Sequence, residues 1–541
     1  MMDRSRARAT KAELSAEATG IHLEQQQDES YHDKLQVPPV TAASRYHPKV
    51  PTPQRIFNFT QLAAFAITFM SSWEVMALNM GGAFYNGGPQ VLTWGVLLCS
   101  VGGLAQALSL AELSAIRPIA GAQYHWTELL APEPYRRLIT WMQGWVTWFA
   151  WVSLLAGVAA GTSNILLGTV IANYPDTYVE QPWHITVTII AQFVFAGLIN
   201  AYAFQIIPWL EVVAGVLHVV LFVIYIAILL TFGGRNSANF VFLEQTVYSG
   251  WENNFVSWNI GLLIPAWGFV GFDAVVHMAE ETRRAKKAVP RVMVWCIVCN
   301  AVMAFTFVLA LLFSIDHTEE VLASPWPIVV VLISTAGTSG GTALLAGLLT
   351  ISMFVLVACV ASVSRITWSW ARDGALPTWF ARVDPRHHIP IRGLLLPCAI
   401  VILLSLFTVG NTATVTVFSA FTALSSLGLY TSYFIAISCL LHARLSGRLG
   451  DKPTSAVQYG DWRLPSNIAT PINIYALLWT IYITIWLPFP TTIPVTGANM
   501  NYAGPIYLVV VIGAVTYWIT WGRKNWPGLN KSPIEMVAAH D

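Results

Sequence analysis

The chain has 541 residues, of which 55% are hydrophobic and 11% are charged, and its formal net charge is +1 at pH 7. A mean hydropathy of +0.57 excludes an ordinary soluble domain. We therefore expect an integral membrane protein whose partner is the lipid bilayer, and we expect no nucleic-acid partner.

The N-terminal segment, residues 1–55, is polar and charged and has no apolar stretch typical of a signal peptide. We expect it to be a disordered cytoplasmic tail. Beyond it, runs of about 20 apolar residues, the length that crosses a bilayer, predict twelve transmembrane helices within one membrane domain at residues 56–525. The predicted spans are residues 61–86, 90–115, 139–171, 184–204, 208–232, 256–279, 291–315, 341–368, 393–410, 413–442, 471–488 and 503–522.

Basic residues are distributed unevenly between the loops that join these spans. If the N-terminus is cytoplasmic, Arg235 is the basic residue left outside, and the others fall in the tails and in the even-numbered loops. This distribution follows the positive-inside rule and predicts an even number of spans. Both termini, including the tail at residues 526–541, are therefore expected in the cytoplasm.

Two spans are interrupted at matching depth. The first contains Ser71, Ser72, Trp73 and Glu74, and the sixth contains the segment Ile264-Pro-Ala-Trp-Gly-Phe269. A broken helix leaves backbone N–H and C=O groups near the bilayer centre, where they are tolerated beside a cavity or a ligand. Paired breaks are the best sequence indication of a transporter's substrate site. The predicted substrate-binding residues are Ser71, Ser72, Trp73, Glu74, Ala266, Trp267, Gly268 and Phe269.

Glu74 lies at the first break after about a dozen uncharged residues. A carboxylate at that depth costs about 2.5–3.5 kcal/mol to insert, so a functional role is the default interpretation. Glu74 either faces the cationic head of an amine substrate or carries a coupled proton; alternatively it accepts hydrogen bonds from freed backbone amides. Trp73, Trp267 and Phe269 flank the breaks and suggest a cage for a cation, although aromatic residues often simply pack.

Further ionisable residues follow along the chain. His218 lies seven residues after Glu211 in the fifth span, so the two share a helix face. Histidine titrates near neutrality, which makes Glu74, Glu211 and His218 candidates for proton coupling; a neutral core histidine is the alternative. Asp273, Glu280, Glu281 and Arg283 follow the second break and predict a charge network that closes the cytoplasmic side; for Glu280 and Glu281 a solvated helix end is the alternative.

Three long motifs occur in order: AELSAIRPIAGAQYHWTELLAP at residues 111–132, GFVGFDAVVHMAEETRRAKKAVPRVM at residues 268–293 and SRITWSWARDGALPTWFARV at residues 364–383. Together with PINIYALLWTIYI at residues 471–483, they resemble the amino acid–polyamine–organocation permeases, in particular the fungal branch of GABA and choline permeases. The resemblance covers about residues 55–525. Several long motifs in the same order are more specific than one short pattern.

The resemblance implies an all-α fold of the LeuT type. Five spans at about residues 61–232 and five at about residues 256–442 form inverted repeats, and two peripheral helices follow at about residues 471–522. The third motif adds Arg365 and Asp373 to the cytoplasmic gate. Relatives that take α-amino acids usually carry a Gly-Ser-Gly-like segment at the first break, whereas this chain has Ser71-Ser72-Trp73. That departure favours a substrate dominated by a positive nitrogen.

These observations predict a transporter, not an enzyme, that needs no cofactor or metal. We expect a proton-coupled symporter in a fungal plasma membrane that imports choline, GABA or a related amino acid or amine by alternating access. Two alternatives remain open: a nutrient receptor that transports nothing, and an α-amino acid permease or exchanger of the same fold.

Overall fold

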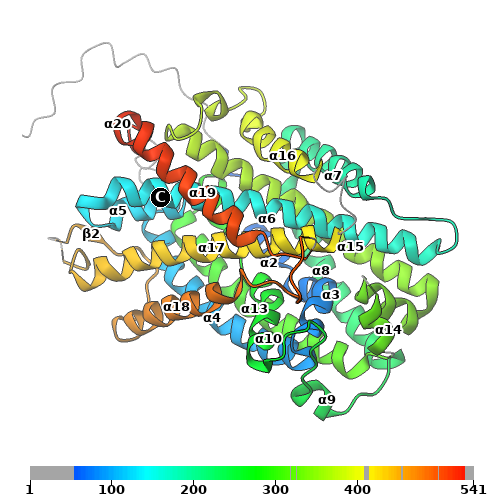
Figure 1. Cartoon of the computed structure of the whole chain (residues 1–541). Helices are drawn as coiled ribbons and strands as arrows, with labels where there is room; N and C mark the ends of the chain where they lie inside the picture. The colour runs from blue at the N-terminus through cyan, green and yellow to red at the C-terminus, as the bar shows by residue number, and fades with distance from the viewer. Residues whose placement is uncertain are drawn as a thin grey trace, which may run out of the picture. The chain divides into compact units, whose positions relative to one another are not determined.

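The computed structural model describes residues 54–316, 318–324, 326–406, 414–452, 455–497 and 499–530. Within these residues the chain is almost entirely helical (Figure 1). The two strands, β1 (Leu449–Gly450) and β2 (Val457–Gln458), form a short parallel pair. The first half of the chain contains α2 (Phe59–Met70), α3 (Ser72–Tyr85), α4 (Gly88–Ile116), α5 (Gln123–Leu130), α6 (Arg136–Asn173), α7 (Pro182–Tyr202) and α8 (Ile207–Phe232).

The second half begins with the short helices α9 (Ala238–Leu243), α10 (Asn254–Gly261), α11 (Leu263–Trp267) and α12 (Ala274–His277). Longer helices follow, interrupted by the short α14 (Thr318–Ala323). They are α13 (Ala285–Ser314), α15 (Pro327–Arg372), α16 (Ile391–Ser405), α17 (Thr414–Leu445), α18 (Ser466–Trp486), α19 (Ala503–Tyr517) and, after a π-helical turn, α20 (Arg523–Asn525).

Ten helices among the described residues are long and apolar enough to cross a membrane, with α2 and α3 counted as one span. The broken segment α10–α12 and the 15-residue apolar helix α16 fill the places of the predicted sixth and ninth spans. The observed helices are therefore consistent with twelve spans. The eighth span differs most from its prediction, because α15 begins at Pro327 and continues through a kink at Gly337 (φ 70°, ψ 170°).

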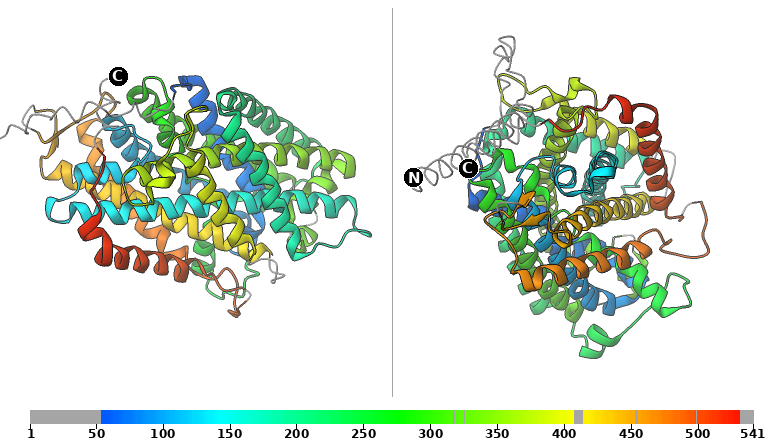
Figure 2. Two further views of the ribbon diagram at one scale, coloured as in Figure 1. Left: turned by 90° about the horizontal axis from the view of Figure 1, so that it is seen from above. Right: turned by 90° about the vertical axis from the view of Figure 1, so that its left-hand side faces the viewer.

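The centre of the bundle is formed by long helices from both halves of the chain. α6 packs against α15 and α17, and α4 packs against α13 (Figure 1). α18 and α19 run along the edge of this arrangement, as Figure 2 shows from two further sides. Most of α19 is exposed: 11% of its most apolar window is buried inside the protein. Such a surface suits contact with lipid, as expected of a peripheral helix.

Both predicted breaks are present. The first is a single left-handed residue, Ser71 (φ 42°, ψ 42°), that separates α2 from α3. The second is longer, because α11 ends at Trp267 and helix resumes at Ala274. Gly271 lies within it at φ +82°, and a Cβ there would stand 2.9 Å from the Phe69 ring. A residue with a side chain would therefore be strained at this position, where the two breaks meet.

The first span begins near the first described residues and ends at Tyr85. Its two ends therefore serve to name the two ends of the bundle. We call the end near Arg55 and Asn530 the terminal end, and the other the opposite end. Phe57 pairs with Thr282 in an isolated parallel bridge at the terminal end. The segment before α2 is thereby attached to the segment that follows the second break.

Candidate functional site

Side chains from neighbouring helices satisfy the backbone at the first break. The Ser72 N–H donates to Oδ1 of Asn300 at 3.0 Å, and Nδ2 of Asn300 donates to the Ile67 carbonyl at 3.2 Å. Ser72 Oγ donates to the Gly268 carbonyl at 2.6 Å, which joins the first break to the second. Sequence reasoning missed Asn300, although a lone asparagine within the apolar seventh span was a visible signal.

Two tyrosines of α17 support the second break. Tyr430 OH donates to the Ala266 carbonyl at 3.2 Å, and the Gly271 N–H donates to Tyr433 Oη at 3.2 Å. Tyr433 in turn donates to Oδ1 of Asp273 at 2.5 Å. Side chains of α17, the tenth span, therefore form hydrogen bonds with the unwound backbone. Buried peptide groups that are not paired within a helix need such partners. Sequence reasoning assigned no role to either tyrosine.

Glu74 and His218 form a buried pair beside the first break. His218 Nδ1 lies 2.5 Å from Glu74 Oε1, and their side chains are 0% and 2% exposed, respectively. The second carboxyl oxygen, Oε2, is buried and accepts no hydrogen bond from the described residues. Glu74 thus has one oxygen engaged by an imidazole and one acceptor still unused. The structure therefore places Glu74 in contact with His218, two residues that the sequence analysis gave as candidates for proton coupling.

Glu211, the third candidate for proton coupling, lies on the same helix as His218. Its side chain is fully buried, and neither carboxyl oxygen has a hydrogen-bond partner among the described residues. One turn further along, Gly215 packs closely against Ala64 of α2. Glu211 lies about two helical turns before His218 and takes no part in the Glu74–His218 hydrogen bond.

A small cavity of about 70 Å³ lies at the breaks. Three of the predicted substrate residues, Ser71, Glu74 and Trp267, line it, and the rest of its wall is mostly apolar. Trp267 Nε1 donates to Ser425 Oγ of α17 at 3.2 Å. We call this space the central cavity.

The other predicted substrate residues have different surroundings. Trp73 is buried among Tyr225, Phe307 and the His218 ring, with centroids 5.2, 5.1 and 5.9 Å away, and it does not line the central cavity. Phe269 is fully buried and packs near Gly103. The remaining three contribute hydrogen bonds to the breaks: Ser72, Ala266 and Gly268.

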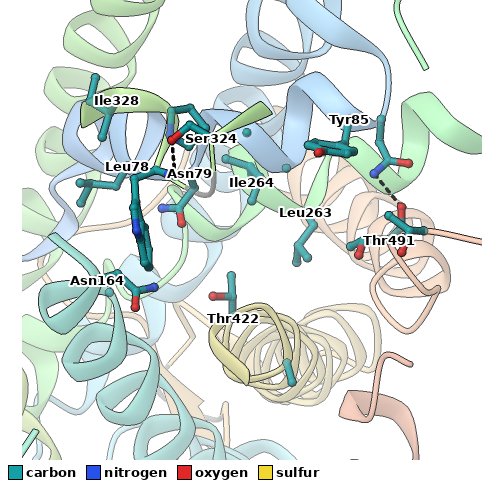
Figure 3. A pocket seen from close by; sticks show the side chains of 18 of the residues that line it. Leu78, Asn79, Tyr85, Asn164, Leu263, Ile264, Ser324, Ile328, Thr422 and Thr491 are labelled. Carbon is teal, nitrogen blue, oxygen red and sulfur yellow. Dashed lines mark hydrogen bonds between the residues drawn. The ribbon is translucent and has the colours of Figure 1, made fainter. Parts of the chain in front are cut away.

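A second, larger cavity of about 490 Å³ extends from the central cavity toward the opposite end. The two share Leu78, Asn79 and Gly161 as lining residues. Asn79, Asn164 and Thr422, from α3, α6 and α17, turn toward a common space in it (Figure 3). At its rim, Tyr85 is 37% exposed. We call this space the outer cavity; it connects the breaks with the surface at the opposite end.

Buried and partly buried ion pairs lie at the terminal end. Glu281 Oε1 accepts hydrogen bonds from Arg365 Nε at 3.1 Å and Nη2 at 2.9 Å, and both side chains are at most 3% exposed. Glu280 pairs with Arg372 at 3.0 Å. The Arg365 guanidinium also lies 3.9 Å from the centre of the Phe204 ring. These contacts tie the segment after the second break to the end of α15.

Two buried aspartates, Asp273 and Asp373, also lie at this end. Asp273 accepts a hydrogen bond from Gln123 Nε2 at 2.5 Å as well as from Tyr433. Asp373 accepts from Tyr124 OH at 2.8 Å and contacts His125 Nε2 at 3.0 Å. Gln123, Tyr124 and His125 belong to the first long motif, but sequence reasoning gave them no role. We define the terminal-end network as Asp273, Glu280, Glu281, Arg365, Arg372 and Asp373.

Asp373 also receives the end of the described chain. The Asn530 N–H donates to its Oδ1 at 3.0 Å, and Trp526 Nε1 donates to its carbonyl at 2.8 Å. Burial by itself would raise the pKa of Asp373. The His125 ring, the positive charge of Arg372 and the Asn530 amide outweigh this effect and lower the pKa below its usual value.

Arg283, the last predicted gate residue, lies outside this network. Its Nε donates to the Arg55 carbonyl at 3.3 Å in an exposed position. The described residues also contain no group of three or more His, Cys, Asp or Glu side chains arranged to hold a metal ion.

The sequence pattern of a family described as amino acid permease matches residues 57–513, which include both breaks, both cavities and the terminal-end network. The chain belongs to this family, within the amino acid–polyamine–organocation superfamily. The permease is 27% identical to the choline transporter of Saccharomyces cerevisiae, over 90% of this chain and 84% of that protein. It is 27% identical to amino-acid permease 2 of Neurospora crassa, over 86% and 83% of the two chains.

The fold is shared with a more distant protein. A crystal structure of a mutant manganese transporter from Eremococcus coleocola matches 90% of the permease and covers 96% of that chain, with a TM-score of 0.50 and 13% identity. At this identity the likeness concerns the fold alone. The permease is thus an integral membrane protein of an amino acid and choline permease type, and its relatives are transporters rather than enzymes.

Proposed function

We propose that the permease is a proton-coupled symporter that imports a small amine-containing nutrient, such as choline, GABA or a related amino acid or amine, across a fungal plasma membrane. Its substrate binds in the central cavity, in contact with Ser71, Glu74 and Trp267. The tails before residue 56 and after residue 525 lie in the cytoplasm. The observation that carries this proposal is the buried Glu74–His218 pair at the edge of that cavity.

A carboxylate that contacts both an imidazole and a cavity can link two binding events. When His218 donates to Glu74 Oε1, the carboxylate keeps its negative charge and attracts an ammonium group into the central cavity. When a proton neutralises the carboxylate, that attraction is lost. Symport therefore requires the coupled proton to reside on His218 while Glu74 stays ionised and holds the ammonium, so that proton and cation occupy the site together.

The two ends of the bundle differ in a way that supports alternating access. The outer cavity leads from the breaks to the opposite end, whereas the terminal-end network closes the other path. Substrate release into the cytoplasm then requires the Glu281–Arg365 and Glu280–Arg372 pairs to separate. The segments that carry the breaks rock against the remaining helices around a fixed site.

The test is uptake of labelled amines by a permease-deficient yeast, with and without the permease, at about pH 5 and about pH 7.5. Accumulation that is faster at the lower external pH is expected. A receptor would give no accumulation in cells or in reconstituted vesicles. Equal rates at the two pH values would contradict proton coupling.

Glu74→Gln removes the charge with little change in shape. Uptake is expected to fall by about tenfold or more, because an uncharged amide no longer compensates a desolvated ammonium. Glu133→Gln is the matched control, since Glu133 is an 80% exposed carboxylate. His218→Gln keeps the charge of Glu74, so it is expected to abolish the pH dependence while substrate exchange persists. Undiminished uptake by Glu74→Gln would remove both roles of Glu74.

A further inference from the structure

The charges that line the two cavities restrict the substrate beyond its being an amine. Glu74 is the one formally charged side chain among the described residues that line either the central or the outer cavity. A charge that enters a desolvated site without a partner is strongly disfavoured. The cavities therefore provide a partner for one positive charge of the substrate, and they provide no positive partner for a negative group of the substrate.

Backbone amides are the usual alternative partner for a carboxylate at a helix break. Here five of these amides already donate to other groups. At the first break the Ser71 N–H donates to the Ile67 carbonyl and the Ser72 N–H to Asn300. At the second break the Phe269 and Val270 amides donate to carbonyls of α11, and the Gly271 amide donates to Tyr433. A substrate carboxylate would have to displace these hydrogen bonds while lying close to the negative Glu74.

The outer cavity offers neutral polar groups instead. Its lining includes the amides of Asn79 and Asn164 and the hydroxyl of Thr422, which face a common space (Figure 3). Oδ1 of Asn164 accepts no hydrogen bond from the described residues. Such groups bind hydroxyl or amide substituents of a substrate, and they do not neutralise a second ammonium or a carboxylate.

We infer that the substrate is a monocation whose remaining part is neutral, such as an amino alcohol or a quaternary ammonium alcohol, and that the site rejects zwitterions and dications. This inference rests on the proposed function, because it assigns the charge class of the substrate at the same site. The inferred charge class separates the proposed substrates. Choline belongs to this class, whereas GABA, α-amino acids and polyamines do not.

Compounds that differ in one group test this directly. Choline and glycine betaine share a quaternary ammonium and differ in an alcohol against a carboxylate. The compounds 4-aminobutan-1-ol, GABA and putrescine share an amine on a four-carbon chain and carry an alcohol, a carboxylate or a second amine. Each would be measured as a labelled substrate and as a competitor in the yeast used above.

The two alcohols are expected to be accumulated and to compete about tenfold or more better than their charged partners. Equal or better transport of glycine betaine, GABA or putrescine would overturn the inference while leaving an amine symporter in place. Accumulation of none of the five compounds would instead overturn the proposed function and, with it, the inference.

A gain of function provides the second arm. Asn164→Lys places a cation in the outer cavity and is expected to improve competition by GABA relative to 4-aminobutan-1-ol by about tenfold, since a carboxylate then has a partner. Asn239→Lys is the matched control, because Asn239 is exposed on α9 and lines neither cavity. An unchanged ratio in Asn164→Lys would contradict the electrostatic basis of the selectivity.

Discussion

The central cavity and the terminal-end network use buried charge in opposite ways. At the central cavity a single carboxylate, Glu74, meets one imidazole and keeps an unpaired oxygen. At the terminal end Glu281 and Glu280 each meet an arginine, and Asp273 and Asp373 each accept several hydrogen bonds. Both Glu74 and Glu281 keep one buried carboxyl oxygen without a hydrogen-bond partner among the described residues, so the two regions differ in the partner. An imidazole can gain or lose a proton and suits a site that exchanges its ligand, whereas a permanently charged arginine suits a closure that holds.

The largest effect is expected from breaking the closure. Arg365→Ala leaves Glu281 charged and buried without its partner, and such a change costs about 3–5 kcal/mol. Thermal unfolding of the detergent-purified permease is the measurement, and a clear fall in Tm is expected.

The double variant Glu281→Gln with Arg365→Met removes both charges and keeps similar volumes. It is expected to recover much of the lost stability, because no unpaired charge remains. If Arg365→Ala melts at the same temperature as the natural protein, the pair is solvated and the contrast between the two regions fails.

The central cavity responds to the opposite kind of change. Val158→Phe adds a ring where Val158 lines the central cavity, so it occupies space that the substrate needs. Uptake is expected to fall by about tenfold or more, while Tm changes little, because the ring fills existing space rather than forcing the helices apart. Val179→Phe, at an exposed position outside both cavities, is the control. Full uptake by Val158→Phe would place the substrate elsewhere.

The sequence was most informative where local chemistry is visible. The pattern Ser71-Ser72-Trp73-Glu74 predicted the first break, and the left-handed residue lies within it. Pro265 and Gly268 indicated the second break, which begins directly after Trp267. Both follow from the rule that polar or helix-breaking residues within an apolar span mark an interrupted helix.

Contacts between distant segments were not predictable in the same way. Glu74 and His218 are 144 positions apart, and their pairing depends on how α8 packs beside the first span. Trp73 was predicted at the substrate site from its neighbours in the sequence. The packing directs its ring toward Tyr225 and Phe307 instead. Side-chain direction at a break depends on the helix rotation, which a sequence pattern does not specify.

A smaller effect is expected from Asp373 and depends on pH. The pKa of Asp373 is lowered in the folded protein, because His125, Arg372 and the Asn530 amide outweigh the effect of burial. A lowered folded-state pKa means that ionised Asp373 stabilises the fold above its unfolded pKa of about 3.9. This stabilisation is lost as the pH falls through the lower folded value.

The measurement is the Tm of the natural protein and of Asp373→Asn between about pH 7 and about pH 3. The natural protein is expected to melt higher at neutral pH, and the difference is expected to shrink at the acidic end. Asp176→Asn, at an exposed position, is the control. A difference that stays constant with pH would show that the Asp373 charge is not what anchors the end of the chain.

The smallest effect is expected from Arg283, which the sequence assigned to the gate. Its guanidinium meets a single carbonyl, that of Arg55, in an exposed position, and exposed polar contacts contribute about 0–1 kcal/mol. Arg283→Gln is therefore expected to leave both Tm and uptake close to those of the natural protein, in contrast to Arg365→Ala. If Arg283→Gln instead impairs uptake as strongly as Arg365→Ala, the closure at the terminal end extends into the exposed segment before α2. The terminal-end network would then have to include the bridge between Phe57 and Thr282.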